Sequence, residues 1–190
     1  MTDDRTVDAA DEDRPGEVRL ECISRPANEE DIPVLAIFER ELARLSFPED
    51  PILDLEYHEE KLRRSLEREP EGMIVQTVSS ENAPAGDEIA SWLWLSTKRT
   101  LATSEAYGVL RSLYVRRRYR RHGLALSLAE YALRYFSARD VKKIVAKVHA
   151  GNTAALKVLR QAGFEPLHTT LQFRLEPGEP FFFEDEDEED

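Results

Sequence analysis

The sequence predicts a single α/β domain built around a mixed sheet, with helices packed against the sheet. Three observations carry this prediction. Two segments with helical hydrophobic spacing come early in the chain, a run of strand-like segments follows them, and a strand–helix–strand unit comes late. The two strands of the late unit must be parallel if their connection is a normal right-handed crossover, whereas the earlier run of strands is expected to be antiparallel.

The first elements are a strand and two helices. Apolar and polar residues alternate from Val18 and predict a strand that Pro26 ends. Asn28 is typical of a helix N-cap, and the apolar residues that follow it to Leu45 predict a first helix of roughly four turns. Prolines break that helix, and residues 54–67 predict a charged second helix with a thin apolar stripe.

Strands dominate the rest of the domain. Five more strands are predicted, at residues 73–78, 89–95, 107–115, 141–148 and 167–175. The almost wholly apolar second strand of this set should lie deep in the sheet. Two helices separate the last three strands: one has an apolar stripe from Leu124 to Phe136, and a shorter one over 152–161 ends at Gly163, a good C-cap.

The charge of the chain is concentrated at its two ends. The net charge is -12, yet residues 1–17 and 176–190 together carry -14 and the body between them carries +2. We therefore divide the chain into an acidic disordered leader (1–17), one folded domain (18–175) and an acidic, solvated tail (176–190). Three phenylalanines, Phe181 to Phe183, should pack onto the body or onto a second subunit, so a homodimer is one of two expected arrangements.

The composition excludes several classes of protein. The chain has no apolar run long enough to span a membrane, and its first residues lack the features of a secretory or transit signal. We therefore expect a cytoplasmic protein with no membrane partner. The single Cys22 excludes an intramolecular disulfide framework, and the four scattered histidines predict no metal site.

The most informative segment is the basic stretch after the strand at 107–115. Residues 113–128 read Leu-Tyr-Val-Arg-Arg-Arg-Tyr-Arg-Arg-His-Gly-Leu-Ala-Leu-Ser-Leu, so a strand delivers the chain directly into a helix N-terminus. Unpaired backbone N–H groups and the positive end of the helix dipole bind anions at such a place, and a glycine lets the backbone approach closely. We predict a site for a pyrophosphate or a similar anion. Its donors and small residues are Arg120, Arg121, His122, Gly123 and Ala125.

Simpler interpretations of the same residues stay open. The run from Arg116 to Arg118 also suits a solvated turn, Gly123 an ordinary turn glycine, and His122 an exposed bystander. The segment is not a Walker-type loop, because no Lys-Ser/Thr follows the glycine. It is not a dinucleotide fingerprint either, because only one of the three glycines is present.

The six arginines from Arg111 to Arg121 also permit a nucleic-acid surface, with Tyr114 and Tyr119 as stacking partners. We rank this interpretation last. The body carries only +2, and the acidic tails would repel a phosphate backbone, whereas a local cluster that faces one small anion needs no global charge. We therefore expect no nucleic-acid partner.

Three motifs, in order, resemble those of the GNAT superfamily of N-acetyltransferases. Arg120 to Ala125 resembles the signature R/Q-x-x-G-x-G/A, and Leu113-Tyr-Val115 resembles the strand that enters it. Asn152 to Phe164 resembles the family's Asn-x-x-Ala helix that ends in Gly-Phe. Ser24 to Asp31 resembles its usual entry from the first strand to the first helix. The similarity spans nearly all of 18–175.

The resemblance implies a GNAT-like acyl-CoA N-acyltransferase fold, in which a central, mostly antiparallel sheet has splayed fourth and fifth strands and is flanked by helices. It also implies acetyl-CoA as co-substrate, bound in the cleft between those two strands, and no metal. The pantetheine arm would lie on the fourth strand and the pyrophosphate on the amides of the basic turn. Asn152 equally suits a simple N-cap. The implied cofactor-binding residues are Leu113, Tyr114, Val115, Arg120, Arg121, His122, Gly123, Leu124, Ala125, Asn152 and Ala155.

The family's usual acid and base are both missing from this chain. Leu159 stands where the family frequently has a tyrosine proposed to protonate the departing thiolate. Val109 stands where some members have a glutamate as general base. Each possible replacement base also suits an ordinary solvated position. The replacements that the sequence offers are Glu105 and His149 as bases and Tyr114 as acid, with Tyr107 and Tyr119 as alternatives to Tyr114.

The predicted function is transfer of an acetyl group from acetyl-CoA to a primary amine of a small molecule or a protein. Direct attack in a ternary complex can proceed without a dedicated base, since orientation and a backbone oxyanion donor lower the barrier. The alternative is a CoA-binding module of the same fold with little or no turnover. Leu159 and Val109 motivate that alternative.

The acceptor side is expected beside the loop 47–51, the second helix and residues 98–104, which are variable parts of proteins of this resemblance. Three acids there, Glu49, Asp50 and Glu59, would favour a cationic amine, and they equally suit solvated positions.

Overall fold

The computed structural model describes residues 22–78, 88–100 and 105–171. Its five strands form one sheet in chain order. Their bounds are β1 Cys22–Pro26, β2 Met73–Val78, β3 Glu88–Arg99, β4 Ala106–Val115 and β5 Ile144–Ala146. The first three neighbouring pairs are antiparallel, and β4 and β5 are parallel. The predicted mixed, mostly antiparallel sheet is therefore confirmed.

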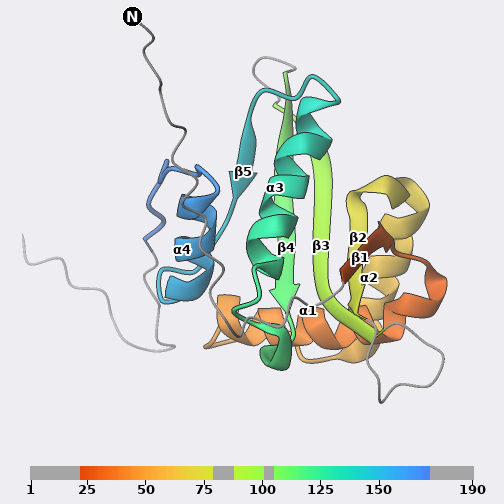
Figure 1. The fold of residues 1–190 in the computed structure, drawn as a ribbon. Coiled ribbons are helices and arrows are strands. Elements are labelled where there is room, and N and C mark those ends of the chain that lie inside the picture. Colours follow the sequence, from red (N-terminus) through yellow and green to blue (C-terminus); the bar gives the residue numbers. More distant parts are fainter. Residues whose placement is uncertain (1–21, 79–87, 101–104, 172–190) are drawn as a thin grey trace, which may run out of the picture.

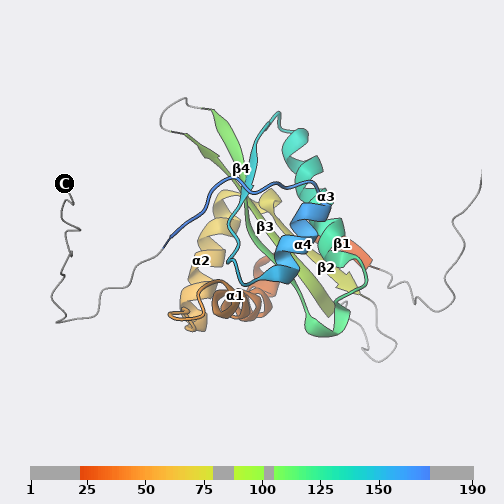
Figure 2. The same cartoon turned by 90° about the vertical axis from the view of Figure 1, so that its left-hand side faces the viewer.

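Helices cover both faces of this sheet (Figure 1). Their bounds are α1 Ile32–Ser46, α2 Leu55–Arg68, α3 Leu124–Ser137 and α4 Thr153–Gln161. Figure 2 shows α1 and α2 on one side of the sheet and α3 and α4 on the other. Each face of the sheet packs against its helices to form a separate core, and successive side chains of a strand point to opposite faces. Val75 of β2 packs with α1 and α2, whereas Ile74 packs with α3.

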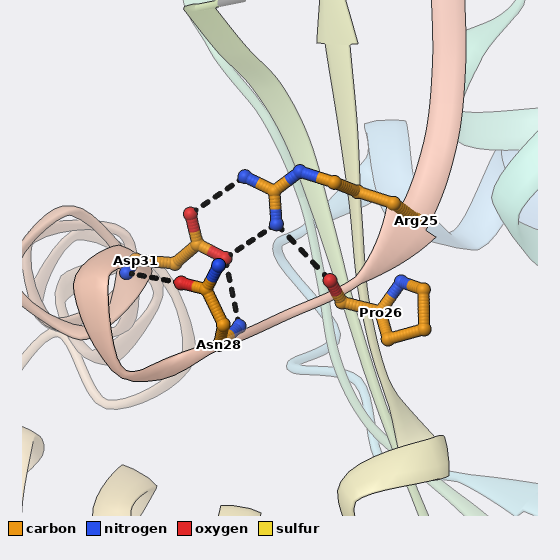
Figure 3. Close-up of polar contacts among 4 residues, drawn as sticks. All are labelled: Arg25, Pro26, Asn28 and Asp31. Carbon is orange, nitrogen blue, oxygen red and sulfur yellow. Dashed lines mark hydrogen bonds and ion pairs between the residues drawn. The ribbon is translucent and has the colours of Figure 1, made fainter.

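A set of polar contacts between β1 and the first turn fixes the start of α1 (Figure 3). Asn28 caps a 3-10 turn, Glu29–Asp31, and exchanges hydrogen bonds with Asp31 in a capping box. The guanidinium of Arg25 donates to both oxygens of the buried Asp31 carboxylate, at 2.7 and 2.8 Å. The N-cap predicted at Asn28 is confirmed, and Asp31 joins the strand to the helix.

Asp31→Ala removes the capping box and leaves the Arg25 guanidinium without its carboxylate. We expect the variant to lose about 2–3 kcal/mol of unfolding free energy in a urea titration, because one cap and one charged hydrogen-bond pair disappear. Glu30→Ala replaces an exposed neighbour and should change stability by less than about 0.5 kcal/mol. Equal losses in the two variants would contradict the role given to Asp31.

Several predicted strand bounds differ from the observed ones. β3 runs on to Arg99, beyond the predicted 89–95, because residues 96–99 pair with β4. β1 ends at Pro26, as predicted: residues 22–26 pair with β2, and an edge strand tolerates the proline. Residues 18–21 lie outside the described residues. The strand predicted over 141–148 is only Ile144–Ala146, since no other residues there pair with β4 in the described structure. The strand predicted over 167–175 is wrong for residues 167–171, which form no strand, and 172–175 are not described.

Gly108 lets α3 approach the sheet where β4 meets β5. A Cβ at this position would lie 2.7 Å from the buried ring of Phe136 on α3. The Gly108 amide also donates to the Lys143 carbonyl at 2.8 Å, directly before β5. The crossover predicted between two parallel strands is therefore confirmed, and α3 lies tightly across it.

The leader 1–17, the tail 176–190 and the Phe181–Phe183 triplet lie outside the described residues. Among the helices that the structure describes, none combines the length and the apolar character needed to cross a bilayer.

Candidate active site

A β-bulge in β4 opens the sheet. In the pairing of β3 with β4, Trp94 lies opposite Ser112 and the next residue, Leu95, lies opposite Leu110, so Arg111 has no partner. Such an extra residue bends its strand and increases the local twist. The pairing of β4 with β5 covers only Gly108 to Leu110 and ends directly before the bulge. Beyond Leu110 the two strands separate, as the resemblance implied.

The backbone of β4 beyond the bulge presents a free edge. The Arg116 amide donates to the Ala90 carbonyl at 2.9 Å, which makes this residue pair a hydrogen-bonded one. Hydrogen-bonded pairs alternate along an antiparallel ladder, so the N–H and C=O groups of Leu113 and Val115 point away from β3. They face the gap left by β5. The two residues predicted to hold a pantetheine arm therefore direct backbone groups along this edge, and of these groups the Val115 carbonyl already accepts a hydrogen bond from Arg120.

The chain turns from β4 into α3 through a short loop with two residues in the left-handed region. Arg121 has φ 69° and Gly123 has φ 75°. The Arg120 Nε donates to the Val115 carbonyl at 3.0 Å and ties the loop to the end of the strand. Among the described residues, no group accepts a hydrogen bond from the amides of residues 121–125. These unpaired donors at a helix N-terminus form a seat for an anion.

Gly123 leaves this seat open. A Cβ at Gly123 would meet no atom within 4 Å, so the described protein leaves the space beside this residue open. The side chains of Arg121 and His122 are exposed beside it. Leu124 and Val115 pack together beneath the loop and hold the strand end against the helix start.

Glu88, at the start of β3, organises the basic loop. Its carboxylate accepts hydrogen bonds from Arg116 at 2.7 Å, from the Tyr119 hydroxyl at 2.8 Å and from Arg118. Arg116 and Arg118 are thus structural, in agreement with the simpler interpretation of that run. Arg117 and Arg121 have no ion pair to a described carboxylate, and they remain available to an anion.

A partly buried polar network connects the first turn of α3 to the sheet. The Gln76 amide nitrogen donates to Ser24 and to Ser127, at 3.3 Å each, and the Ser91 hydroxyl donates to the Gln76 carbonyl oxygen at 2.6 Å. Ser127 lies in the first turn of α3, whereas the other three residues lie on β1, β2 and β3. The network therefore orients the helix whose N-terminus forms the anion seat.

The helix α4 begins as predicted. The Asn152 side-chain oxygen accepts from the Ala155 amide at 3.2 Å, so Asn152 is an N-cap, and its side-chain nitrogen donates to no group among the described residues. Gly163 has φ 91° and ends the helix, since the Phe164 amide donates to the Leu159 carbonyl at 2.9 Å. Leu159 is buried in the core shared with α3.

Tyr114 points away from the free edge. Its ring stacks on Phe38 of α1 at 4.5 Å between centroids, and its hydroxyl donates to Glu41 at 2.5 Å. Burial, followed by the hydrogen bond to Glu41 and its negative charge, raises the pKa of Tyr114 to about 12. A phenol with such a pKa gives up its proton less readily than a thiol, whose ordinary pKa is about 8.5. In this arrangement Tyr114 is a poor proton donor to a thiolate.

The two predicted bases lie on opposite sides of the β4–β5 pairing. Glu105 is exposed directly before β4, roughly 20 Å along the strand from the bulge. His149 is exposed after β5, and its Nδ1 accepts from the Gly151 amide at 3.1 Å. That hydrogen bond requires a bare Nδ1 and leaves the proton of a neutral ring on Nε2. The structure does not bring Glu105, His149 and Tyr114 together.

The acetyltransferase (GNAT) family model matches residues 37–164. The chain belongs to the GNAT acetyltransferase family. The match includes the bulge of β4, the basic loop and α4, which are the parts that build the cleft. No curated protein sequence matches the chain.

Solved structures share this fold. The NatC complex bound to Gag peptide and CoA has a chain that is 21% identical, with a TM-score of 0.64 over 78% of this chain and 87% of that chain. A predicted acetyltransferase with acetyl-CoA from Clostridium acetobutylicum is 15% identical, with a TM-score of 0.62 over 80% and 96%. An aminoglycoside acetyltransferase from an uncultured soil sample, in complex with sisomicin, is 14% identical, with a TM-score of 0.55 over 82% and 97%. At these identities the comparisons show the fold alone.

Arg121→Gly should raise stability, because glycine adopts the left-handed conformation without the steric cost that a Cβ brings. We expect a gain of about 1 kcal/mol in a urea titration. Arg121→Ala is the matched control, since it removes the same side chain but keeps the Cβ, and it should show no gain. A gain of the same size in both variants would mean that the arginine side chain, rather than its backbone, is the source of strain.

Proposed function

We propose that this protein transfers an acetyl group from acetyl-CoA to a primary amine of a small molecule or a protein, by direct attack within a ternary complex. Family membership supports acetyl transfer. The observation that carries the rest is the joint geometry of the unpaired amides at residues 121–125 and the free edge of β4, because a diphosphate and an amide-bearing arm need these two kinds of donor side by side.

The diphosphate and the pantetheine arm of acetyl-CoA would each have a matching group on this chain. The amides of residues 121–125, together with the exposed Arg121 and His122, would hold the diphosphate. Leu113 and Val115 would pair with the amides of the pantetheine arm as an additional strand does, and the side-chain nitrogen of Asn152 would reach the arm from α4. Two observations support this fit. The amides of residues 121–125 are unpaired among the described residues, and a Cβ at Gly123 would meet no atom within 4 Å.

The chain's own groups would lower the barrier mainly through orientation and electrostatics. The bound thioester supplies an activated acetyl carbonyl. A free-edge amide of β4 would donate to that carbonyl oxygen as negative charge develops on it, and the walls of the cleft would hold the amine in line with the carbonyl carbon. Water or His149 would remove the amine proton, whereas Glu105 lies too far along β4 from the bulge to act there directly.

Cytoplasmic residence and a protein or small-molecule acceptor are part of this proposal. Two proteins of the same fold bind molecules of these two kinds, since one is bound to a peptide and the other is in complex with sisomicin. A homodimer through the apolar tail segment Phe181–Phe183 stays a prediction from the sequence.

The second candidate is a CoA-binding module without turnover. Burial of Leu159 in the core and engagement of the Tyr114 hydroxyl by Glu41 favour it, because neither position offers a ready proton donor to a departing thiolate. Release of free thiol from acetyl-CoA with a panel of primary amines separates the two candidates. Binding of acetyl-CoA without thiol release above the hydrolysis background would establish the module and exclude the transferase.

Gly123→Glu tests the anion seat directly. Acetyl-CoA should raise the melting temperature of the parent by mass action. The variant should lose this shift, because the glutamate carboxylate would occupy the position of the diphosphate and repel its negative charge. Gly163→Glu is the matched control: Gly163 also has a positive φ and also has open space at its Cβ position. It should lose similar stability and keep the full ligand shift. An unchanged shift in Gly123→Glu would place acetyl-CoA elsewhere.

A further inference from the structure

A second hollow lies on the α2 side of the sheet, near the bulge. It has a volume of about 500 Å³, and it opens between the end of α2, the second half of β3 and β4. Its lining residues are Arg68, Glu69, Ser96, Thr97, Lys98 and Arg111. Arg111 is the bulge residue itself, so the hollow adjoins the point where β4 and β5 part.

The hollow is strongly cationic. Arg68, Lys98 and Arg111 are exposed, and none of them forms an ion pair with a described carboxylate. Arg111 lies over the Trp94 ring at 4.5 Å, a contact that holds its guanidinium but leaves its charge uncompensated. The single acid of the lining, Glu69, is engaged, because its carboxylate accepts the Thr97 amide at 3.0 Å.

A buried hydroxyl completes the lining. Ser96 is 5% exposed, and its Oγ has no hydrogen-bond partner among the described residues. A buried polar group without a partner costs stability, and such a group beside a hollow is a ready donor to a ligand. Ser96 therefore points to a polar occupant independently of the cations.

The hollow and the cleft between β4 and β5 both reach the sheet at the bulge. An arm that leaves the diphosphate seat and follows the free edge of β4 runs from Val115 back toward Arg111, where pairing with β5 closes the cleft. Ser96 lies opposite Val109, two residues before the bulge. The acyl end of the arm would thus arrive next to the cationic hollow.

We propose that this hollow binds an oxyanion, a carboxylate or a phosphate, carried by the acceptor amine. This inference rests on the proposed function and narrows it to anionic acceptors. Arg68, Lys98 and Arg111 would attract the oxyanion and Ser96 would donate a hydrogen bond to it. Polycationic acceptors would be repelled. The inference reverses the expectation from Glu49, Asp50 and Glu59, whose loop and helix positions do not line the hollow.

Matched primary amines of graded chain length test this inference. Each set contains an ω-amino acid, the corresponding aminoalkylphosphonate, the amide and the diamine, and thiol release gives kcat/KM for each. We expect a preference of about tenfold or more for the acid or the phosphonate over the amide and the diamine, the size of one charged hydrogen bond. The acceptor with the higher kcat/KM, the amino acid or the phosphonate, identifies the oxyanion that the hollow prefers. Equal rates, or faster diamines, would overturn the inference.

The double variant Arg68→Gln/Lys98→Gln should reduce this preference about tenfold, measured as the ratio of kcat/KM for the acid to kcat/KM for the amide. Lys142→Gln/Lys157→Gln removes the same charge from exposed sites away from the hollow and should keep the preference. Ser96→Ala should weaken the preference without loss of stability, because it removes an unpartnered hydroxyl. An unchanged preference in the double variant would exclude the hollow as the acceptor site.

Failure of the proposed function is distinguishable from failure of this inference. If no amine of the panel releases thiol, the transferase proposal fails for these acceptors. A binding measurement then tests whether the hollow takes an oxyanion. In the presence of CoA, the N-acetylated acids should raise the melting temperature of the parent but not of Arg68→Gln/Lys98→Gln, and the N-acetylated amides should raise neither. Identical shifts for acids and amides would overturn the inference.

Discussion

The bulge at Arg111 is the constraint on which the cleft depends. A strand with one extra residue cannot stay in register with both neighbours, and β4 keeps its register with β3 beyond the bulge while it loses β5. Unpaired backbone groups at an internal edge of a sheet are costly unless water or a ligand satisfies them. The free edge of β4 is therefore both a consequence of the bulge and the reason that an extended, amide-bearing ligand fits there.

The anion seat depends on a second set of contacts, which fix how the chain leaves β4. Arg120 binds back to the strand end, Glu88 gathers Arg116, Arg118 and Tyr119, and the Gln76 network holds the first turn of α3. These contacts hold a strained loop in one conformation, with Arg121 in a region that favours glycine. They allow the amides of the seat to stay in place without partners of their own. Preorganised donors of this kind need little rearrangement when an anion arrives.

Local signals allowed much of this fold to be predicted. The cap at Asn28, the period of the helices and the basic loop with Gly123 are short-range features, and the structure contains each of them. The motif residues of the proposed diphosphate site followed from the same local pattern. The strand expected over 167–175 failed over its first five residues because a strand requires a pairing partner, and a pattern of apolar residues cannot supply one.

The features that the sequence did not reveal depend on contacts between distant residues. The bulge is defined by the register of two strands, and the contact that engages Tyr114 joins residues 73 positions apart. Glu88 is separated from the arginines that it organises by 28 and 30 positions, so its role had no local signal. The cationic hollow gathers residues of α2, β3 and β4 in the same way. The sequence allowed the acids near the acceptor side to be named, because they are close together in the chain. It did not predict that the cations lining the hollow lie together.

Amide hydrogen exchange with and without acetyl-CoA tests the central claim most directly, since it reports on backbone groups one segment at a time. The account predicts slower exchange on ligand addition at residues 121–125 and along 113–115, with little change at β1 and β2. Unchanged exchange in both segments, together with protection elsewhere in the domain, would contradict it.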